Sequence, residues 1–354
     1  MMILKGFKDS RIPGVKDSIE ILNNDNACSI RVMGDPWSDF SEKTLDSLYQ
    51  RIGRRTYNLK AFAMKILYTS DIHASPEHLL SMLSAAANKA VDALVIGGDI
   101  IPHHLPDAES FGVLQAQEMY LKNVFIPRIK NFKQHREVDI FLDLGNDDFI
   151  CIRKSLKDRG SDVFRLLHMQ KHKLTEHVDI IGYMIVPPTP FYRKDWEKPD
   201  CVETPFAPGN IVALDGYTSI NGLLNETVID PASDDTIESD LNRLAQKIDR
   251  PFIFVAHSPP YQTPLDVLDN GLHVGSVSIR RFIEAWSARG LMVASLHGHI
   301  HGAPNRSGRV HTSIENTLCI NPGQNEGKGA ELRYVILELT GQKTPRVRML
   351  YEPE

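Results

Sequence analysis

The segment LHGHIHG, residues 296–302, is the most informative part of the chain, because it carries three histidines at alternate positions directly after an apolar run. Alternate side chains of an extended backbone lie on one face, so His299 and His301 are expected to face one cavity at the end of a strand. Such an arrangement is typical of metal ligands. A chance cluster on a surface hairpin and a lone pair of zinc ligands are the alternatives at this point.

The composition of the chain narrows the class of protein. Of its 354 residues, 42% are hydrophobic and 24% are charged, which excludes disordered and fibrous proteins and allows one large domain or two smaller ones. The formal net charge of −5 provides no general basic surface for nucleic acid or anionic lipid. We therefore expect neither nucleic acid nor a membrane as a partner.

The cysteines and the start of the chain indicate the compartment. Four widely spaced cysteines match no C-x-x-C metal motif and form no evident disulfide framework: Cys28, Cys151, Cys201 and Cys319. The first residues contain neither a long apolar core nor a small-residue cleavage site, and no run reaches the ~18 apolar residues of a membrane span. We expect a cytoplasmic protein.

Residues 1–63 carry no catalytic motif, and we interpret them as an N-terminal extension. A short helix is predicted at residues 41–51, where apolar positions recur at helical spacing. Arg51, Arg54 and Arg55 near its end either face a phosphate or form a solvated helix end. We expect the extension to pack on the main domain or to mediate assembly into a homo-oligomer.

From residue 64 onward, strands alternate with helices and end in polar residues of metal-ligand type. Predicted strands at 65–70, 93–96 and 138–144 precede Asp71 and His73, then Asp99, then Asn146, with helices at 77–91 and 108–134 between them. Ligands in open α/β sheets gather outside the carboxyl ends of the strands. These side chains are therefore expected to meet in space.

The second half of the chain continues this pattern after an interruption. Strands are predicted at 179–186, 251–256 and 291–296, helices at 236–248 and 276–288, and three last strands at 317–320, 334–339 and 346–350 are expected to form a second sheet that closes the fold. His257 follows the strand at 251–256. The proline-rich segment 187–234 predicts irregular structure over much of its length.

Four residues of that proline-rich segment are candidates for contact with a substrate: Tyr192, Arg193, Lys194 and Trp196. Long irregular loops in compact domains often act as lids or specificity elements. An ordered surface excursion that does not contact substrate is the alternative reading of this segment.

Taken in order, the strand-end motifs resemble those of the calcineurin-like metallophosphoesterases, which run D-x-H, G-D or G-G-D, G-N-H-D/E, a single His, and G-H-x-H. The resemblance covers residues 64–354, and the HVGS element at 273–276 is similar to that of a microbial subgroup. It implies an α/β fold, a four-layer α/β/β/α sandwich of two mixed β-sheets with a small N-terminal extension. It also implies two divalent metal ions, the first held by Asp71, His73 and His301, the second by Asn146, His257 and His299, with Asp99 bridging both.

The chemistry of these residue types agrees with the resemblance. Imidazole and carboxylate ligands without thiolate suit manganese, which we expect, and also iron, zinc, cobalt or nickel. A bridging carboxylate holds two ions ~3.5–4 Å apart, the separation that clamps a phosphoryl group. Two ions, two carboxylates and a bridging hydroxide sum to a net charge of roughly +1, which attracts an anionic phosphate. In-line attack of the hydroxide on phosphorus would follow.

Asp147 departs from the family pattern, because the family has a histidine after Gly-Asn and this chain has Asp147 followed by Asp148. That histidine usually protonates the leaving group or binds the phosphate, and general acid catalysis typically contributes 10²–10⁴-fold. Asp147 is therefore the candidate catalytic residue. Either the substrate is a phosphodiester with a good leaving group, or the acid comes from His103, His104 or His273, although for each of these three a surface histidine without a catalytic role is the favoured interpretation.

These motifs lead us to expect a dinuclear metal-dependent phosphoesterase that acts on a small phosphorylated substrate such as a nucleotide, more readily on a phosphodiester than on a monoester. The alternative is a weakly active or inactive binding or scaffold protein with the same fold. His297 shares the expected strand face but lies deeper, so we expect it to pack in the core or to support a ligand.

Overall fold

A computed structural model describes residues 63–102, 112–327, 329–341 and 344–353, together with the backbone of strands β1 (Ile19–Asn24) and β2 (Ala27–Val32). The chain divides into two compact units, Met1–Lys60 and Ala61–Glu354, each of which is described by itself. In the first unit, β1 and β2 pair antiparallel with Ile19 opposite Val32. The helix expected at 41–51, with Arg51, Arg54 and Arg55, lies outside the described residues.

The second unit contains two six-stranded sheets, and the first follows the order β16-β15-β3-β4-β5-β6. Its parallel strands are β3 (Ala63–Thr69), β4 (Ala93–Ile96), β5 (Asp139–Leu142) and β6 (Arg165–Leu166). β15 (Val335–Thr340) and β16 (Arg346–Tyr351) add an antiparallel edge. All four residues of β4 are buried, as expected for a central strand covered on both faces.

The second sheet follows the order β13-β14-β12-β11-β8-β7. Its parallel strands are β8 (Asp179–Tyr183), β11 (Phe252–Ala256), β12 (Met292–Leu296) and β14 (Thr317–Ile320). Antiparallel strands β7 (Lys171–Lys173) and β13 (His311–Ile314) form the two edges. Both sheets are therefore mixed, as the resemblance implied.

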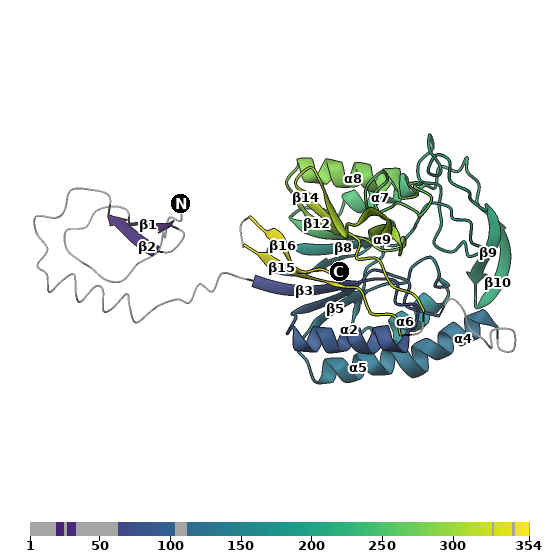
Figure 1. Cartoon of the computed structure of the whole chain (residues 1–354), viewed down its shortest axis with the longest axis horizontal. Helices are drawn as coiled ribbons and strands as arrows, with labels where there is room; N and C mark the ends of the chain where they lie inside the picture. The colour runs from purple at the N-terminus through teal and green to yellow at the C-terminus, as the bar shows by residue number, and fades with distance from the viewer. Residues whose placement is uncertain are drawn as a thin grey trace, which may run out of the picture. The chain divides into compact units, whose positions relative to one another are not determined.

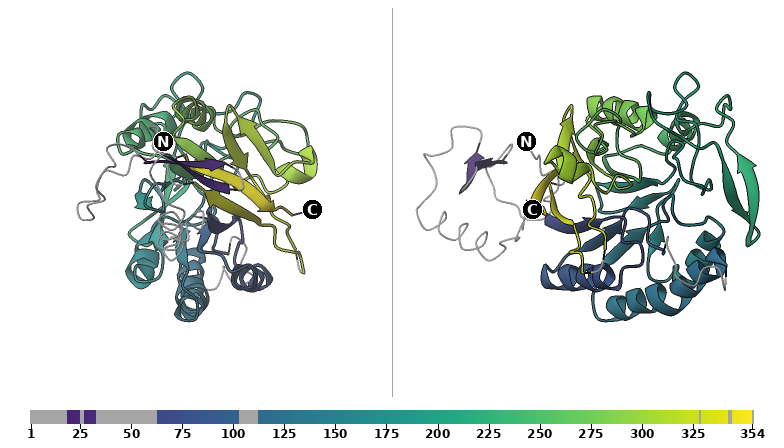
Figure 2. Two further views of the ribbon diagram at one scale, coloured as in Figure 1. Left: turned by 90° about the vertical axis from the view of Figure 1, so that its left-hand side faces the viewer. Right: turned by 45° about the vertical axis from the view of Figure 1, so that its right-hand side comes forward.

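Helices cover the outer face of each sheet (Figures 1 and 2). α2 (Pro76–Asn88), α4 (Val113–Tyr120), α5 (Ile126–Gln134) and α6 (Ile152–Gly160) lie on the side of the first sheet, and α7 (Ile237–Ala245) and α8 (Val277–Ala288) on the side of the second. In α8, buried Ile279, Phe282, Ile283 and Trp286 recur at the spacing of one helix face. The expected four-layer sandwich is confirmed.

The structure corrects the expected position of the last strands. Only β14 joins the second sheet, whereas β15 pairs with β3 of the first sheet and places Val335 opposite Tyr68. A strand-like run in the sequence predicts an extended backbone but not the sheet edge with which it pairs.

Two further segments differ from the sequence predictions. The helix expected at 108–134 is interrupted by a π-helical turn, η1 (Leu121–Phe125), directly before Pro127, which has no N–H to continue the helical hydrogen bonds. The proline-rich segment contains an unexpected antiparallel hairpin of β9 (Asp215–Ile220) and β10 (Leu223–Val228). The prolines lie outside these two strands, so they do not prevent the pairing.

His168 is a half-buried histidine near the edge of the second sheet. Its ring lies 5.5 Å from the Tyr183 ring and 5.1 Å from the Trp196 ring, measured between centroids. Its Nδ1 accepts a hydrogen bond from the backbone N–H of Met184 at 3.1 Å, which requires the unprotonated nitrogen. Burial lowers the pKa of His168 to about 4.

We expect the protein to lose stability as the pH falls from about 6.5 to about 4, and His168→Asn to reduce this loss. The unfolded chain protonates His168 near its ordinary pKa of about 6.5, whereas the folded state does so only near 4, so protons favour unfolding in this window by up to about 3 kcal/mol. Asparagine can keep the acceptor for Met184 without titrating. The thermal unfolding midpoints of both proteins near pH 7 and pH 5 provide the measurement.

His177→Asn is the matched control, because His177 is exposed and its ring makes no hydrogen bond within the described residues. This variant should retain the pH dependence of the wild type. An H168N protein whose midpoint falls as steeply as that of the wild type would contradict the assignment.

Candidate metal centre

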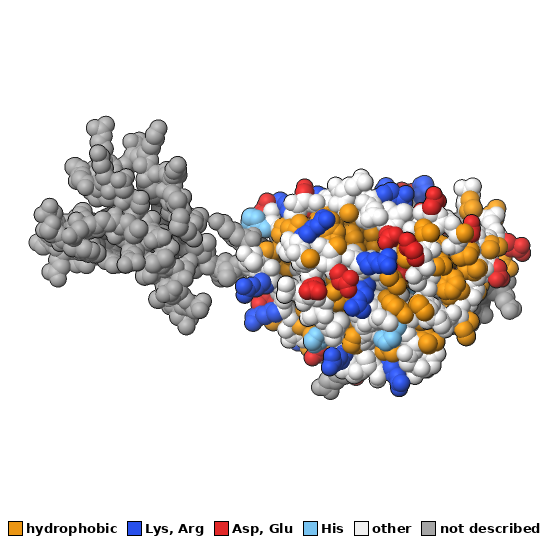
Figure 3. Space-filling model, turned by 90° about the horizontal axis from the view of Figure 1, so that it is seen from above, with side chains coloured by type: hydrophobic (Ala, Val, Ile, Leu, Met, Phe, Trp, Pro, Cys, Tyr) orange, Lys and Arg blue, Asp and Glu red, His pale blue; other side chains and the backbone are white. Residues whose placement is uncertain are grey.

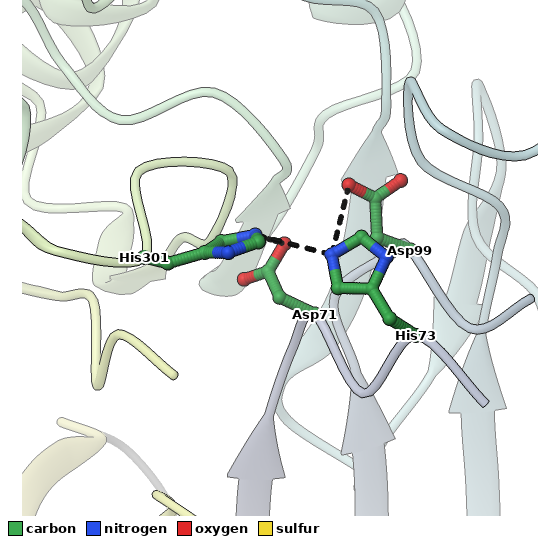
Figure 4. Close-up of side chains that lie close together, drawn as sticks. All are labelled: Asp71, His73, Asp99 and His301. Atoms are coloured by element: carbon green, nitrogen blue, oxygen red, sulfur yellow. Dashed lines mark hydrogen bonds and ion pairs between the residues drawn. The ribbon is translucent and has the colours of Figure 1, made fainter. Parts of the chain in front are cut away.

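Four of the expected ligands converge at the carboxyl ends of the strands. Asp71 and His73 follow β3, Asp99 follows β4, and His301 follows β12 of the other sheet. One ligand atom from each of these residues lies within 4.8 Å of the others. Figure 4 shows Asp71 and Asp99 above neighbouring strands, with His301 reaching them from the opposite side. Both sheets therefore contribute to one cluster.

Short distances connect these four side chains (Figure 4). Nε2 of His73 lies 3.2 Å from Nε2 of His301 and 3.9 Å from Oδ2 of Asp99. Nε2 of His301 lies 3.4 Å from Oδ1 of Asp71. Imidazole nitrogens and carboxylate oxygens thus face one another across a space that a single divalent ion could fill.

The other three expected ligands adjoin this cluster through Asp99. Nε2 of His257 lies 3.2 Å from Oδ2 of Asp99 and 3.0 Å from Oδ1 of Asn146. The ring of His299 lies 5.3 Å from that of His257 between centroids. Asp99 therefore lies between the two groups of side chains, although this second group is less compact than the first.

The backbone around the centre differs from the extended conformation that the histidine spacing predicted. β12 ends at Leu296, and His299 has a positive φ of 66°. Asp71, His73 and Asp99 also have positive φ values, of 59°, 39° and 51°. Non-glycine residues rarely adopt this conformation, and such strain is concentrated at functional sites. The histidines are therefore placed by a turn and not by alternation along a strand.

His297 lies away from the cluster, in the core. It is fully buried, its Nε2 lies 2.8 Å from Ser295 Oγ, and its Nδ1 lies 3.0 Å from the carbonyl oxygens of Ala256 and Ser258. Its polar contacts are therefore satisfied by the second sheet, as a packed core histidine requires.

Two outer contacts fix the orientation of ligand histidines. His257 Nδ1 lies 2.8 Å from the Gly97 carbonyl oxygen, which leaves its Nε2 to face Asp99 and Asn146. His301 Nδ1 contacts the Glu326 carboxylate, which leaves its Nε2 to face Asp71 and His73. Metal-binding histidines usually make such contacts. Glu326 was missed in the sequence because no motif marks it.

The electrostatics of the centre favour cations. Burial alone would raise the pKa of Asp71 and Asp99, yet the neighbouring His301 and His257 rings hold both pKa values below the ordinary range. Although burial opposes it, Asp99 raises the pKa of His257 to about 9. Burial lowers the pKa of His299 to about 3. The residues present therefore fit divalent ions.

Asp147 and Asp148 have different surroundings. The fully buried Asp148 carboxylate accepts hydrogen bonds from the backbone N–H groups of Ile100, Ile101 and Gly145, so it joins two ligand loops. The Asp147 side chain is 19% exposed, and its Oδ2 lies 3.9 Å from His73 Nδ1. Burial raises the pKa of Asp147 to about 6, and Asp99 adds to the rise while Arg193 opposes it.

Of the other candidate acids, His273 alone lies among the described residues. His103 and His104 lie outside the described residues. His273 Nδ1 lies 2.7 Å from Asp266 Oδ1, and the His273 ring lies 6.4 Å from the Tyr261 ring. Among the substrate candidates, Tyr192 is exposed, whereas Lys194 and Trp196 are buried, Lys194 in an ion pair with Glu197 and Trp196 in a hydrogen bond to the Asp148 carbonyl oxygen.

A two-sheet α/β sandwich with an Asp/His cluster at its strand ends defines a metallophosphoesterase. The sequence model of the calcineurin-like phosphoesterases matches residues 64–303, and the chain belongs to this family. Within the described residues, no helix combines the length and apolar character that crossing a membrane requires.

The chain is similar to a curated relative and to several solved structures. An uncharacterized protein of Methanocaldococcus jannaschii, MJ1162, is 34% identical over 102 residues, which are 28% of this chain and 44% of that protein, so the match spans less than half of the relative. A solved crystal structure has 17% identity and a TM-score of 0.51, over 82% of this chain and all of its own. A dimetal phosphatase from Danio rerio has 9% identity and a TM-score of 0.44, over 82% and 99%.

We expect Glu326→Gln to weaken manganese binding about 10–100-fold, because the outer carboxylate orients His301 and increases its basicity. Isothermal titration of the metal-free protein with Mn²⁺ provides the measurement. Glu331→Gln is the control, since Glu331 is exposed in the same segment and no described contact of its side chain reaches the cluster. Equal affinities of E326Q and E331Q would exclude this role for Glu326.

We also expect Gly298→Ala to abolish tight metal binding. A Cβ at position 298 would collide with Ser70 Oγ and Asp71 Oδ2, so Asp71 would have to move. Gly302→Ala in the same loop is the matched control, because the nearest atom to a new Cβ there is Asp269 Oδ1, at an ordinary 3.9 Å. Metal titration and circular dichroism of both variants separate a local effect from misfolding. If folded G298A binds metal as tightly as the wild type, the loop can rearrange to fit the new methyl group and the prediction is wrong.

Proposed function

We propose that the protein is a dinuclear metal-dependent phosphohydrolase that cleaves a phosphodiester in preference to a monoester. The observation that supports this most is the joining of two ligand groups at Asp99. The first ion would be held by Asp71, His73 and His301, with Asp99 shared. The second would be held by Asn146, His257 and His299, again with Asp99.

Divalent ions bound there would supply Lewis acidity toward phosphate and lower the pKa of coordinated water. The protein holds the ligand oxygen and nitrogen atoms in position before the ions bind. The carboxylates are buried, and the Gly97 carbonyl and Glu326 fix the orientation of two imidazoles. We favour manganese because mixed oxygen and nitrogen donors without thiolate suit it, and iron, zinc, cobalt and nickel are the alternatives for the same donors.

Asp147 supports the preference for a diester. It replaces the histidine that in the family pattern protonates the leaving group, and its carboxylate lies 3.9 Å from His73. A diester with a good leaving group also needs less help from a general acid.

The face of the molecule seen in Figure 3 agrees with a small substrate such as a nucleotide. Acidic and basic side chains are interspersed over the face shown in Figure 3, with no continuous basic area among the described residues of that view. A long polyanion would require such an area.

The protein loaded with Mn²⁺ should contain two ions per chain and hydrolyse bis-p-nitrophenyl phosphate faster than p-nitrophenyl phosphate. Chelation should remove this activity, and Mn²⁺ should restore it, because the phosphate is anionic and the centre attracts it only with cations present. Metal analysis and release of p-nitrophenol provide the measurements.

Dependence of the rate on the leaving group provides a second readout. Without a competent acid, kcat should fall steeply as the pKa of the leaving alcohol rises. A flat profile would show that an acid is present. Two bound metals without turnover of any ester would favour the alternative, a binding or scaffold protein with this fold.

A further inference from the structure

Asp147 connects the metal centre to a residue that lies 46 positions further along the chain. Its backbone N–H donates to Asp99 Oδ1 at 2.9 Å, so its position is fixed relative to the shared ligand. One carboxylate oxygen lies 3.9 Å from His73 Nδ1. The other accepts a hydrogen bond from Nη1 of Arg193 at 3.1 Å. A single carboxylate therefore separates the Arg193 guanidinium from a cluster ligand.

Several contacts hold Arg193 in place. Its guanidinium carbon lies 5.4 Å from the centre of the Phe149 ring and 5.1 Å from that of the Tyr192 ring, within the range of cation–π contacts. Tyr217 pairs with this stretch, since its N–H donates to the Tyr192 carbonyl and its carbonyl accepts from the Lys194 N–H. Only 5% of Arg193 is exposed. Its position is therefore built into the fold.

The four residues that follow Arg193 hold this segment in place through an ion pair and hydrogen bonds. Lys194 and Glu197 form a buried ion pair of 2.9 Å, and Trp196 Nε1 donates to the Asp148 carbonyl at 2.8 Å. Asp195 accepts the backbone N–H groups of Ile150 at 3.0 Å and Ser219 at 2.8 Å. Lys194, Asp195, Trp196 and Glu197 all secure the segment to the protein interior, and Arg193 is the member whose charge is directed to the metal centre.

The charges explain why such a residue is needed. An isolated Asp147 carboxylate beside His73 would repel a phosphate ester, whereas the pair of Asp147 and Arg193 has no net charge. Guanidinium groups bind phosphate through paired N–H donors that a lysine does not offer. Because Arg193 is buried, water screens its charge less, and the guanidinium attracts a nearby anion more strongly.

We propose that Arg193 binds the phosphate group of the substrate at the metal centre and that Asp147 is the residue that positions it. This inference rests on the proposed phosphohydrolase function and assigns a cation to the place where the family pattern has a histidine. Arg193 contacts substrate and Asp147 acts through Arg193. The ligand recognised is the non-bridging oxygens of a phosphate ester, for which inorganic phosphate is the probe.

Isothermal titration of Mn²⁺-loaded protein with inorganic phosphate tests the proposal without requiring turnover. Arg193→Met removes the charge with little change in length and should weaken phosphate binding about tenfold or more, the usual effect of losing a charged hydrogen bond in a buried site. Manganese affinity should stay at the wild-type value because Arg193 is not a ligand. Phosphate binding by R193M as tight as that of the wild type would overturn the proposal.

A double-mutant cycle tests the role of Asp147. In the D147N background the arginine is no longer held by a carboxylate, and no uncompensated anion remains when it is removed. R193M should therefore cost less phosphate affinity there, by a factor of about three or more, than in the wild-type background. An equal loss in both backgrounds would overturn the positioning role of Asp147.

Arg250→Met is the matched control. Arg250 pairs with Asp179, the first residue of β8 and thus at the opposite end of the strand from the metal centre, and this variant should bind phosphate like the wild type. If R193M does not fold, R193K decides the question, since lysine keeps the charge without the paired donors. It should bind phosphate at least about threefold more weakly, and wild-type affinity would count against the proposal.

The kinetic readout separates this inference from the proposed function. If the wild type hydrolyses esters, R193M should raise KM for the diester along with the dissociation constant of phosphate. If wild-type protein binds two metals and phosphate but hydrolyses no ester, the proposed function fails. The titrations would then still report whether Arg193 recognises phosphate.

Discussion

The metal centre depends on one contact between the two sheets, in which the Asp71 carboxylate accepts the backbone N–H of His299 at 3.1 and 3.2 Å. This contact brings the loop after β12 against the loop after β3. The loops after β3 and β4 are joined in turn, because the N–H groups of Asp71 and His73 donate to the carbonyls of Gly98 and Asp99. Each positive φ value at a ligand position costs of order 1–3 kcal/mol of folding free energy. The hydrogen bonds between the loops offset this cost and hold the ligands in the strained conformation.

Much of the fold could be predicted because its signals are local. Buried parallel strands are short apolar runs, amphipathic helices repeat at 3.6 residues, and ligand residues come directly after strands, as Asp99 does after β4. The pairing of β15 with β3 could not be predicted, since it depends on which sheet edge the returning chain meets. The left-handed turn at His299 was also missed, because the contact with Asp71 that stabilises it is 228 positions distant in sequence. Glu326 and Arg193 also lie outside any motif, and their contacts with His301 and Asp147 span 25 and 46 positions.

The proline-rich segment shows how irregular chain can be fixed without a continuous ladder of backbone hydrogen bonds. Carboxylates in this segment accept hydrogen bonds from N–H and O–H groups that would otherwise need a partner in a sheet. Asp200 accepts from Ser276 Oγ and from the N–H of Ser278 at the start of α8, and Asp195 holds the β9–β10 hairpin through Ser219. Removing either acceptor would leave buried donors unsatisfied, a cost of about 1–3 kcal/mol each. The segment was expected to be irregular, and the composition could not reveal that its acidic residues serve as internal acceptors.

The close approach at Gly298 has a consequence for how this protein can diverge. A side chain at position 298 would meet Ser70 and Asp71, so the loop that carries His299 and His301 has almost no freedom to accept new residues. The side chain of Phe191, which is 53% exposed, has no comparable restriction. Divergence at position 298 is therefore confined to glycine for as long as Asp71 and His299 keep their contact, whereas Phe191 can be exchanged without moving a ligand.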